Sequence, residues 1–162
     1  MLFAGAIFGF FYAWVCSTMW GLDAADPRVA IAAMQAMNAS VRNIVFAPAF
    51  FLTPVVLALT GAVAMAGRHR QAAAWFLAAA GVYLAFGLFL TLSVNVPMNE
   101  ALALERVPDD VEAARRVWRD YSQPWQFWNV VRTIASGTAL VLAAAGLAAV
   151  AGDTRRRGAI AA

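Results

Sequence analysis

Four long apolar stretches follow one another along this chain. They run from Leu2 to Leu22, from Ala47 to Gly67, from Ala72 to Val94 and from Val130 to Val150. Each approaches or exceeds the roughly 20 residues that an α-helix needs to cross about 30 Å of hydrocarbon. The pattern therefore predicts an all-α fold, a four-transmembrane-helix bundle that forms a single membrane domain over residues 1–162, with spans at about 2–22, 47–67, 72–94 and 130–150.

The first long connection between spans has a helical period of its own. Asp26 followed by Pro27 is typical of a helix start, with a capping side chain before a proline in the first turn. We expect an amphipathic helix over about residues 27–46. Its polar residues recur on one stripe, which is either a solvated surface or the lining of a pocket, and they are Arg28, Gln35, Asn38 and Arg42.

The second long connection predicts another amphipathic helix, over about residues 109–122. Asp109 stands at the capping position with Glu112 three residues later, as in a capping box. Val111, Trp118 and Tyr121 share one face. Pro124 is expected to end this helix before the fourth span begins.

Composition and charge place these elements in a membrane. The chain is 63% hydrophobic and 13% charged, which is too apolar for a soluble domain. The short link 67–71 and the tail 151–162 carry five arginines and one acid, whereas the long connections hold eight acids against six arginines. Because basic loops favour the cytoplasmic side, we expect a multi-pass protein of the bacterial cytoplasmic membrane with both termini inside. The basic balance thus reflects topology, and no nucleic-acid partner is predicted.

Metal and disulfide chemistry have little support in the sequence. Cys16 and His69 are the single residues of their kinds, so neither a disulfide within the chain nor a tetrahedral zinc site can be assembled. No metal site and no cofactor is predicted.

Arg132 is the one charge inside an apolar span. An ionisable residue at membrane depth costs about 2.5–3.5 kcal/mol on insertion scales and is by default a candidate for function. No acid lies within any of the four spans, so something other than an intramembrane carboxylate must satisfy it. Trp125, Asn129, Arg132 and Ser136 are spaced by four, three and four residues, which points them the same way.

The third span ends in a second polar group. Gly87, Thr91 and Asn95 lie four residues apart on one face, and Pro97 and Asn99 follow. We expect irregular backbone at Pro97, which a membrane protein tolerates only where protein or a watery cavity covers it. The amides of Asn95 and Asn99 then lie at the depth of Arg132 and predict a pocket at the outer end of the bundle.

Small residues predict where the helices approach one another. Gly5, Gly9 and Ala13 form a stripe in the first span. Such stripes allow close packing of helix backbones in membranes, so we expect a close approach there.

Several motifs in order resemble the anthrone oxygenase family of small four-helix integral membrane proteins. They are Phe8-Gly-Phe-Phe-Tyr-Ala-Trp14 with Ser17-Thr-Met-Trp-Gly-Leu22, Ala33-Met-Gln-Ala-Met-Asn38, Asn95-Val-Pro-Met-Asn99, and Trp118-x-x-Tyr121 with Trp125-x-x-Trp128-Asn129-x-x-Arg132. The resemblance implies a four-helix membrane fold. It also implies oxidation of an anthrone to an anthraquinone with molecular oxygen and no cofactor.

Two positions depart from the family pattern. A histidine usually follows the asparagine that corresponds to Asn129, and this chain has Val130. A proline is usual where Trp20 stands. If that histidine is the base of active members, this chain lacks it.

The resulting hypothesis is a membrane-embedded oxygenase acting on an anthrone or related polycyclic phenol. Arg132 would stabilise an anionic form of the substrate, with Asn129 as its catalytic neighbour. The expected substrate-binding residues are Gln35, Asn38, Asn95, Asn99, Tyr121, Trp125 and Trp128. The alternative is a non-catalytic protein that binds a quinone or lipid-like ligand, or a structural or partner subunit. The expected partners are the lipid bilayer and a hydrophobic aromatic small molecule, with a homo-oligomer also possible.

Overall fold

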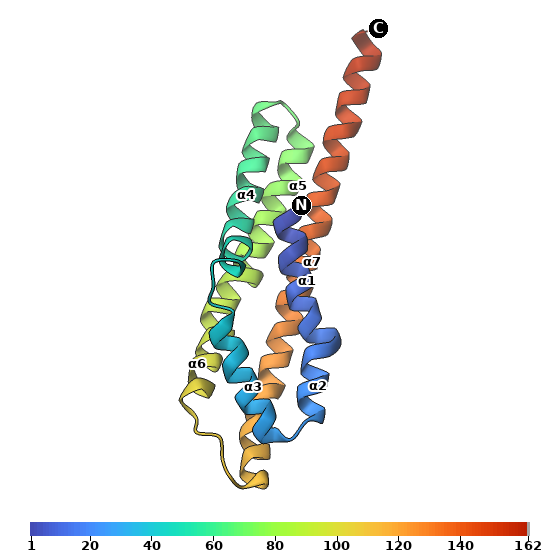
Figure 1. Cartoon of the computed structure of the whole chain (residues 1–162). Coiled ribbons are helices and arrows are strands. Elements are labelled where there is room, and N and C mark those ends of the chain that lie inside the picture. The colour runs from blue at the N-terminus through green and yellow to red at the C-terminus, as the bar shows by residue number, and fades with distance from the viewer. Residues whose placement is uncertain (162) are drawn as a thin grey trace.

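Four long helices lie side by side in an elongated bundle (Figure 1). The structure is a computed structural model that describes the backbone of residues 1–161 and the side chains of residues 1–156 and 159. Within these residues it is helical with no strand. The helices long and apolar enough to cross a membrane are Leu2–Ala24, Phe46–Ala66, Arg70–Leu104 and Val111–Arg156. The predicted all-α fold with four membrane-spanning helices is confirmed.

The first spanning helix contains a wider turn near its outer end. It consists of α1 (Leu2–Ala13), the π-helical segment η1 (Trp14–Thr18) and α2 (Met19–Ala24). The Met19 N–H donates to the carbonyl of Trp14, five residues back. Such π-bulges inside α-helices occur frequently at functional sites.

The first outer helix, α3 (Pro27–Ser40), is shorter than predicted. It was expected to continue to residue 46, but residues 41–45 form a turn instead. The side chain of Asn43 accepts hydrogen bonds from the N–H groups of Val45 and Phe46, each at 2.9 Å. An asparagine that binds the backbone locally competes with helix continuation, and α4 (Phe46–Ala66) begins directly after it.

The third spanning helix continues through Pro97 to Leu104, so the helix end predicted there is wrong, and the irregular backbone expected near Pro97 takes the form of a π-helical turn. It runs as α5 (Arg70–Val82), η2 (Tyr83–Phe89), η3 (Thr91–Asn95) and α6 (Val96–Leu104). In η3 the Val96 N–H donates to the Thr91 carbonyl, five residues back. In a regular α-helix the ring of Pro97 would clash with the carbonyl four residues earlier, and a wider π-helical turn is a way to make room for it.

The fourth spanning helix is continuous with the second outer helix. The structure has one element, α7 (Val111–Ala161), with Pro124 inside it, so the prediction that Pro124 separates two helices is wrong. Trp118, Tyr121 and Trp125 are buried on both sides of the proline. They stay on one face only if the helical phase is unbroken, and the carbonyl freed by Pro124 belongs to Asp120, an exposed residue.

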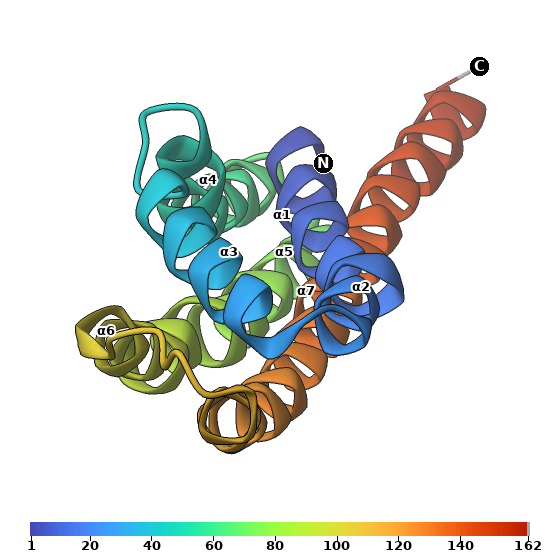
Figure 2. The same ribbon diagram turned by 60° about the horizontal axis from the view of Figure 1, so that its bottom comes forward.

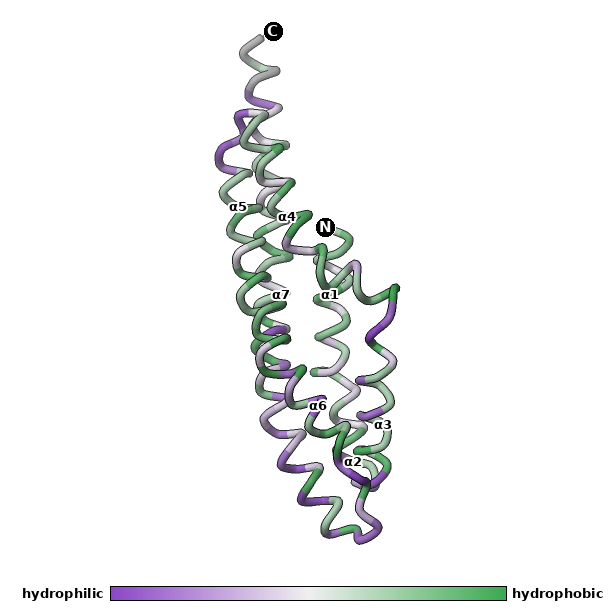
Figure 3. Tube along the Cα trace, turned by 90° about the vertical axis from the view of Figure 1, so that its left-hand side faces the viewer, coloured by the Kyte–Doolittle hydropathy of each residue, from purple (hydrophilic) through white to green (hydrophobic). Residues whose placement is uncertain are grey.

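The bundle has two hydrophobic cores at different heights. The membrane core joins α1, α4, α5 and α7 and includes Ile7, Phe50, Phe76 and Tyr83. The outer core joins α2, α3, α6 and the start of α7 and includes Met34, Leu102 and Trp118. In Figure 3 a long hydrophobic stretch separates hydrophilic segments at the two ends, and in Figure 2 α3 crosses the outer end from α2 toward α4.

Close helix packing occurs at glycines other than those predicted. A Cβ on Gly5 or Gly9 would meet no atom within 4 Å, so the expected close approach along that stripe is wrong. A Cβ on Gly61 would lie 2.9 Å from Leu77, and one on Gly146 would lie 2.9 Å from Phe76. These glycines let α4 and α7 pack tightly against α5.

One hydrogen bond compensates for the proline in the second span. Pro54 has no N–H to give the carbonyl of Phe50, four residues earlier. The hydroxyl of Tyr83, on η2, donates to that carbonyl at 3.0 Å. Tyr83 has no exposed surface, so this bond fixes α4 against the third helix inside the membrane core.

We predict that Tyr83→Phe destabilises the fold by about 1–3 kcal/mol, because a buried carbonyl is left unpaired. Chemical unfolding in detergent would measure the loss. In a Pro54→Ala background, where a backbone N–H replaces the missing donor, the same substitution should cost less. An equal loss in both backgrounds would show that Tyr83 acts through packing alone.

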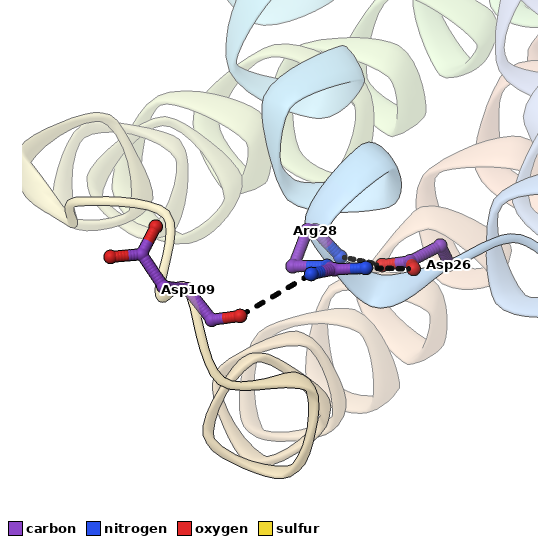
Figure 4. Close-up of polar contacts among 3 residues, drawn as sticks. All are labelled: Asp26, Arg28 and Asp109. Carbon is purple, nitrogen blue, oxygen red and sulfur yellow. Dashed lines mark hydrogen bonds and ion pairs between the residues drawn. The ribbon is translucent and has the colours of Figure 1, made fainter.

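The first turn of α3 is held by a cluster of polar contacts at the outer surface (Figure 4). The Asp26 side chain caps the helix by accepting from the Arg28 N–H at 2.9 Å, and its other oxygen pairs with the Arg28 guanidinium at 2.7 Å. Arg28 also donates to the Asp109 carbonyl at 3.3 Å. The hydrogen bonds from Arg28 hold the pKa of Asp26 at about 2, below its ordinary 3.8.

We predict that the stabilisation from the Asp26 carboxylate is lost as the pH falls from about 4 to about 2. A lowered pKa means that the unfolded chain takes up the proton first, so the contribution is complete above 3.8 and disappears below the folded pKa. Hydrogen exchange of the first-turn amides of α3 would measure it. Asp26→Asn, which keeps a capping oxygen without the charge, should lack this pH dependence. An equal pH response in Asp26→Asn would contradict the assignment.

Candidate functional site

Arg132 lies inside the bundle without a carboxylate partner. Its side chain is on α7, and the residue is 5% exposed. Its Nε donates to the Oδ1 of Asn129 at 2.8 Å. The other two guanidinium nitrogens make no hydrogen bond or ion pair with the part of the chain that the structure describes. An uncommitted charge at this depth is therefore available to a ligand.

Two aromatic rings surround the guanidinium. Its central carbon lies 4.4 Å from the ring centroid of Phe11 and 4.9 Å from that of Trp125. Both distances are within the roughly 6 Å range of cation–π attraction, which contributes about 2 kcal/mol or more at a desolvated site. The rings come from α1 and α7, so the contact also ties the first span to the fourth.

Asn129 fixes Arg132 in place. Besides accepting from Arg132, it donates through Nδ2 to the carbonyl of Phe11 at 3.3 Å. It is 1% exposed and does not line the cavity described below. The structure thus puts Asn129 behind Arg132, where it can orient the guanidinium but cannot contact a ligand in the cavity.

A cavity of about 490 Å³ opens beside Arg132. It lies where the membrane core meets the outer core. One wall is aromatic, and polar side chains face it from α3, α6 and α7. Its aromatic lining comprises Phe10, Phe11, Trp14, Phe46, Phe50, Phe51 and Trp125, and its polar lining includes Asn38, Arg42, Asn43, Thr91, Asn99, Glu100 and Arg132.

The polar wall is a chain of hydrogen bonds, and Trp125 determines which groups in it donate and which accept. The indole N–H of Trp125 can only donate, and it meets Asn99 Oδ1 at 2.8 Å. The Tyr121 hydroxyl donates to the same oxygen at 2.8 Å and accepts from Asn38 Nδ2 at 3.3 Å. Asn99 Nδ2 and Asn38 Oδ1 have no bond to the described residues. The wall therefore offers one free amide nitrogen, which donates, and one free amide oxygen, which accepts.

An exposed ion pair stands at the rim of the cavity. Arg42, in the turn after α3, donates to Glu100 of α6 at 3.3 Å. Both side chains are more than half exposed. Beside them, the cavity lining includes the exposed apolar residues Phe51 and Leu92. The mouth therefore borders both exposed charged residues and exposed apolar residues.

The predicted site residues divide into three groups in the structure. Arg132, Asn38, Asn99 and Trp125 line the cavity, while Asn129 and Tyr121 support these from behind. Gln35, Trp128 and Asn95 form the third group, which does not line the cavity. Gln35 donates to the carbonyls of Leu102 and Glu105 at 2.8 and 2.9 Å, Trp128 packs on Phe127, and Asn95 is fully buried with its amide unpaired among the described residues.

Sequence reasoning named Trp125 but missed the phenylalanines of the aromatic wall. Phe10, Phe11, Phe46 and Phe50 look like ordinary membrane-facing or core residues in apolar spans. The available signal was two phenylalanine-rich runs, one in the middle of the first span and one at the start of the second. Among the described residues, no group of three or more His, Cys, Asp or Glu side chains could hold a metal ion.

The fold and the cavity define a class of protein. It is a multi-pass helical membrane protein with an aromatic cavity that contains a buried arginine without an acidic partner. Residues 41–142 match the sequence profile of the anthrone oxygenase family. This match covers most of the chain and includes the cavity residues of α4, α6 and α7, so the chain belongs to the anthrone oxygenase family. No curated protein and no solved structure matches it.

The position of Val130 explains why its identity matters little to the cavity. Val130 is 40% exposed, on the side of α7 that faces away from the bundle, and is not among the cavity residues. A histidine in its place would point away from Arg132. The departure from the family pattern therefore removes no group from this cavity.

We predict that Asn99→Leu lowers the stability of the fold by about 1–3 kcal/mol for each buried donor left unpaired, namely Trp125 Nε1 and the Tyr121 hydroxyl. Asn99→Asp keeps an oxygen acceptor for both and should retain more of the stability. Unfolding in detergent would compare the two variants. Equal losses would show that the network does not depend on the acceptor.

Proposed function

We propose that this protein is a membrane-embedded oxygenase that oxidises an anthrone or a related polycyclic phenol with molecular oxygen, without a cofactor. The observation that carries the proposal is the uncommitted guanidinium of Arg132 on the wall of an aromatic cavity. A cavity of about 490 Å³ is within the usual range for small-molecule sites. Family membership supports the same chemistry.

The cavity suits a flat aromatic molecule that carries oxygen atoms. Its rings would pack against Trp14, Phe46 and Phe50, which surround the apolar part. One oxygen would face the free nitrogens of Arg132. A phenolic hydroxyl could donate to Asn38 Oδ1, and a second oxygen could accept from Asn99 Nδ2. These polar groups are already oriented by their other hydrogen bonds, which reduces the cost of binding.

Arg132 would promote the reaction by favouring the enolate of the substrate. A cation in a water-poor site stabilises an adjacent oxyanion and so lowers the pKa of the ketone that forms it. Glu100 lies at the rim and is the base that we assign to remove the proton from the ring CH2 group. Asn129 is a positioning residue in this scheme, because it touches Arg132 and not the cavity.

The enolate itself supplies the electrons for oxygen. It transfers one electron to O2, and the resulting carbon radical and superoxide combine to form a C–O bond. Protonation gives a hydroperoxide at the former CH2 carbon. Loss of the remaining C–H proton and cleavage of the O–O bond then release water and leave a second carbonyl. The substrate loses two hydrogens and gains one oxygen atom, and the other oxygen atom leaves as water.

The lining of the cavity mouth indicates how an apolar substrate would arrive. Phe51 and Leu92 are exposed on the lipid-facing side and also line the cavity. A polycyclic phenol dissolved in the bilayer could pass between α4 and the third helix without crossing water. We place the cavity toward the outer face of a bacterial cytoplasmic membrane, with both termini inside, on the basis of the loop charges.

Oxygen uptake by the purified full-length protein tests the function, with a panel of anthrones, hydroquinones and naphthols as substrates. We predict that Arg132→Met lowers kcat/KM for an anthrone by about 100- to 1000-fold, as expected when a donor to a developing oxyanion is removed. The residual rate should require a higher pH, because the pKa of the bound substrate is no longer lowered. Arg119→Gln, at an exposed position of α7, is the matched control.

Stability provides a second readout on the same variants. Arg132→Met removes a buried charge without an acidic partner, so the melting temperature should not fall substantially, although Asn129 Oδ1 loses a donor. Unchanged oxygen uptake in this variant would contradict the mechanism. If no substrate in the panel is turned over but an aromatic quinone co-purifies, the cavity belongs to a binding protein and the enzymatic proposal is wrong.

A further inference from the structure

A second cavity lies at the end of the bundle opposite the Arg132 site. It measures about 270 Å³ and forms where the turn between α4 and α5 meets the C-terminal part of α7. His69 Nδ1 lies 2.6 Å from the Asp153 carboxylate and joins these two parts of the chain. Figure 1 shows this turn and the end of α7 on the same side of the molecule.

The second cavity carries an excess of positive charge. Arg68, Arg70 and Arg156 line it, and Asp153 is its one acidic lining residue. The Asp153 carboxylate is engaged by His69. Arg70 and Arg156 make no ion pair or hydrogen bond with the described side chains. Two arginines thus remain available for an anion.

The depth of the cavity selects the kind of anion. The apolar helix α4 ends at Ala66, and α5 begins at Arg70 after a turn of three residues. Because about 20 residues of helix cross about 30 Å of hydrocarbon, this turn lies at the level of the lipid headgroups. Phosphate groups are concentrated there, and the guanidinium group matches phosphate oxygens in two-pronged geometry.

We propose that this cavity binds the phosphate of an anionic phospholipid headgroup, with Arg70 and Arg156 as the residues that contact it. Basic pockets between membrane helices on the cytoplasmic side are suited to such headgroups. Gln71, which also lines the cavity, can donate to a headgroup oxygen. The site is separate from the Arg132 cavity and does not depend on the proposed oxidation.

Lipid binding to the purified full-length protein tests this proposal. The probes are phosphatidylglycerol and phosphatidylcholine, each added to detergent-solubilised protein and counted by native mass spectrometry. We expect phosphatidylglycerol to bind preferentially. Arg70→Gln combined with Arg156→Gln should weaken this binding by roughly 30-fold, from about 1 kcal/mol for each basic residue at an anionic surface.

A neighbouring arginine provides the control. Arg155 precedes Arg156 on the same helix, is exposed and does not line the cavity. We expect Arg156→Gln to weaken phosphatidylglycerol binding severalfold more than Arg155→Gln does. Equal effects of the two substitutions would show general attraction to the basic surface and overturn the site. Equal binding of the two lipids would show no preference for an anionic headgroup and would also overturn it. Displacement of phosphatidylglycerol by millimolar inorganic phosphate would identify a site for a soluble anion and overturn the lipid assignment.

Discussion

The structure depends on accommodating one guanidinium inside an apolar bundle. Insertion of an arginine at membrane depth costs up to about 2.5–3.5 kcal/mol, and cation–π contact at a desolvated site returns about 2 kcal/mol or more. The rings of Phe11 and Trp125 and the amide of Asn129 supply this compensation. None of them neutralises the charge, so Arg132 retains its attraction for an anionic ligand.

The surrounding helices accommodate three prolines in three physically different ways. At Pro54 a tyrosine hydroxyl from a neighbouring helix donates to the Phe50 carbonyl, for which the proline has no N–H. Pro97 follows a wider π-helical turn. The carbonyl that Pro124 leaves without a helical donor belongs to an exposed residue, Asp120. Two of these arrangements keep helices continuous past Pro97 and Pro124, so that Asn99, Trp125 and Arg132 can all line the cavity.

Much of this could be predicted from the sequence because membrane insertion imposes simple rules. Runs of apolar residues identified four spanning helices, and an isolated charge in the fourth identified Arg132. The positions where helices end were harder to predict. A proline is a strong local signal for a helix end, yet α7 continues because Trp118, Tyr121 and Trp125 bury the same face on both sides of Pro124. Close packing at Gly61 and Gly146 was also missed, since it depends on the side chains of another helix.

The sequence by itself determined the class of the protein and its four spanning helices, and it singled out the residue on which the proposed site centres. These follow from hydrophobicity and charge, which are properties of each segment alone. Only the tertiary structure decided the role of each neighbour. Asn129 and Asn99 are both amides predicted for the same site, but one contacts Arg132 and the other faces the cavity. That difference depends on how the helices are rotated against one another, and packing between segments distant in the sequence determines the rotation.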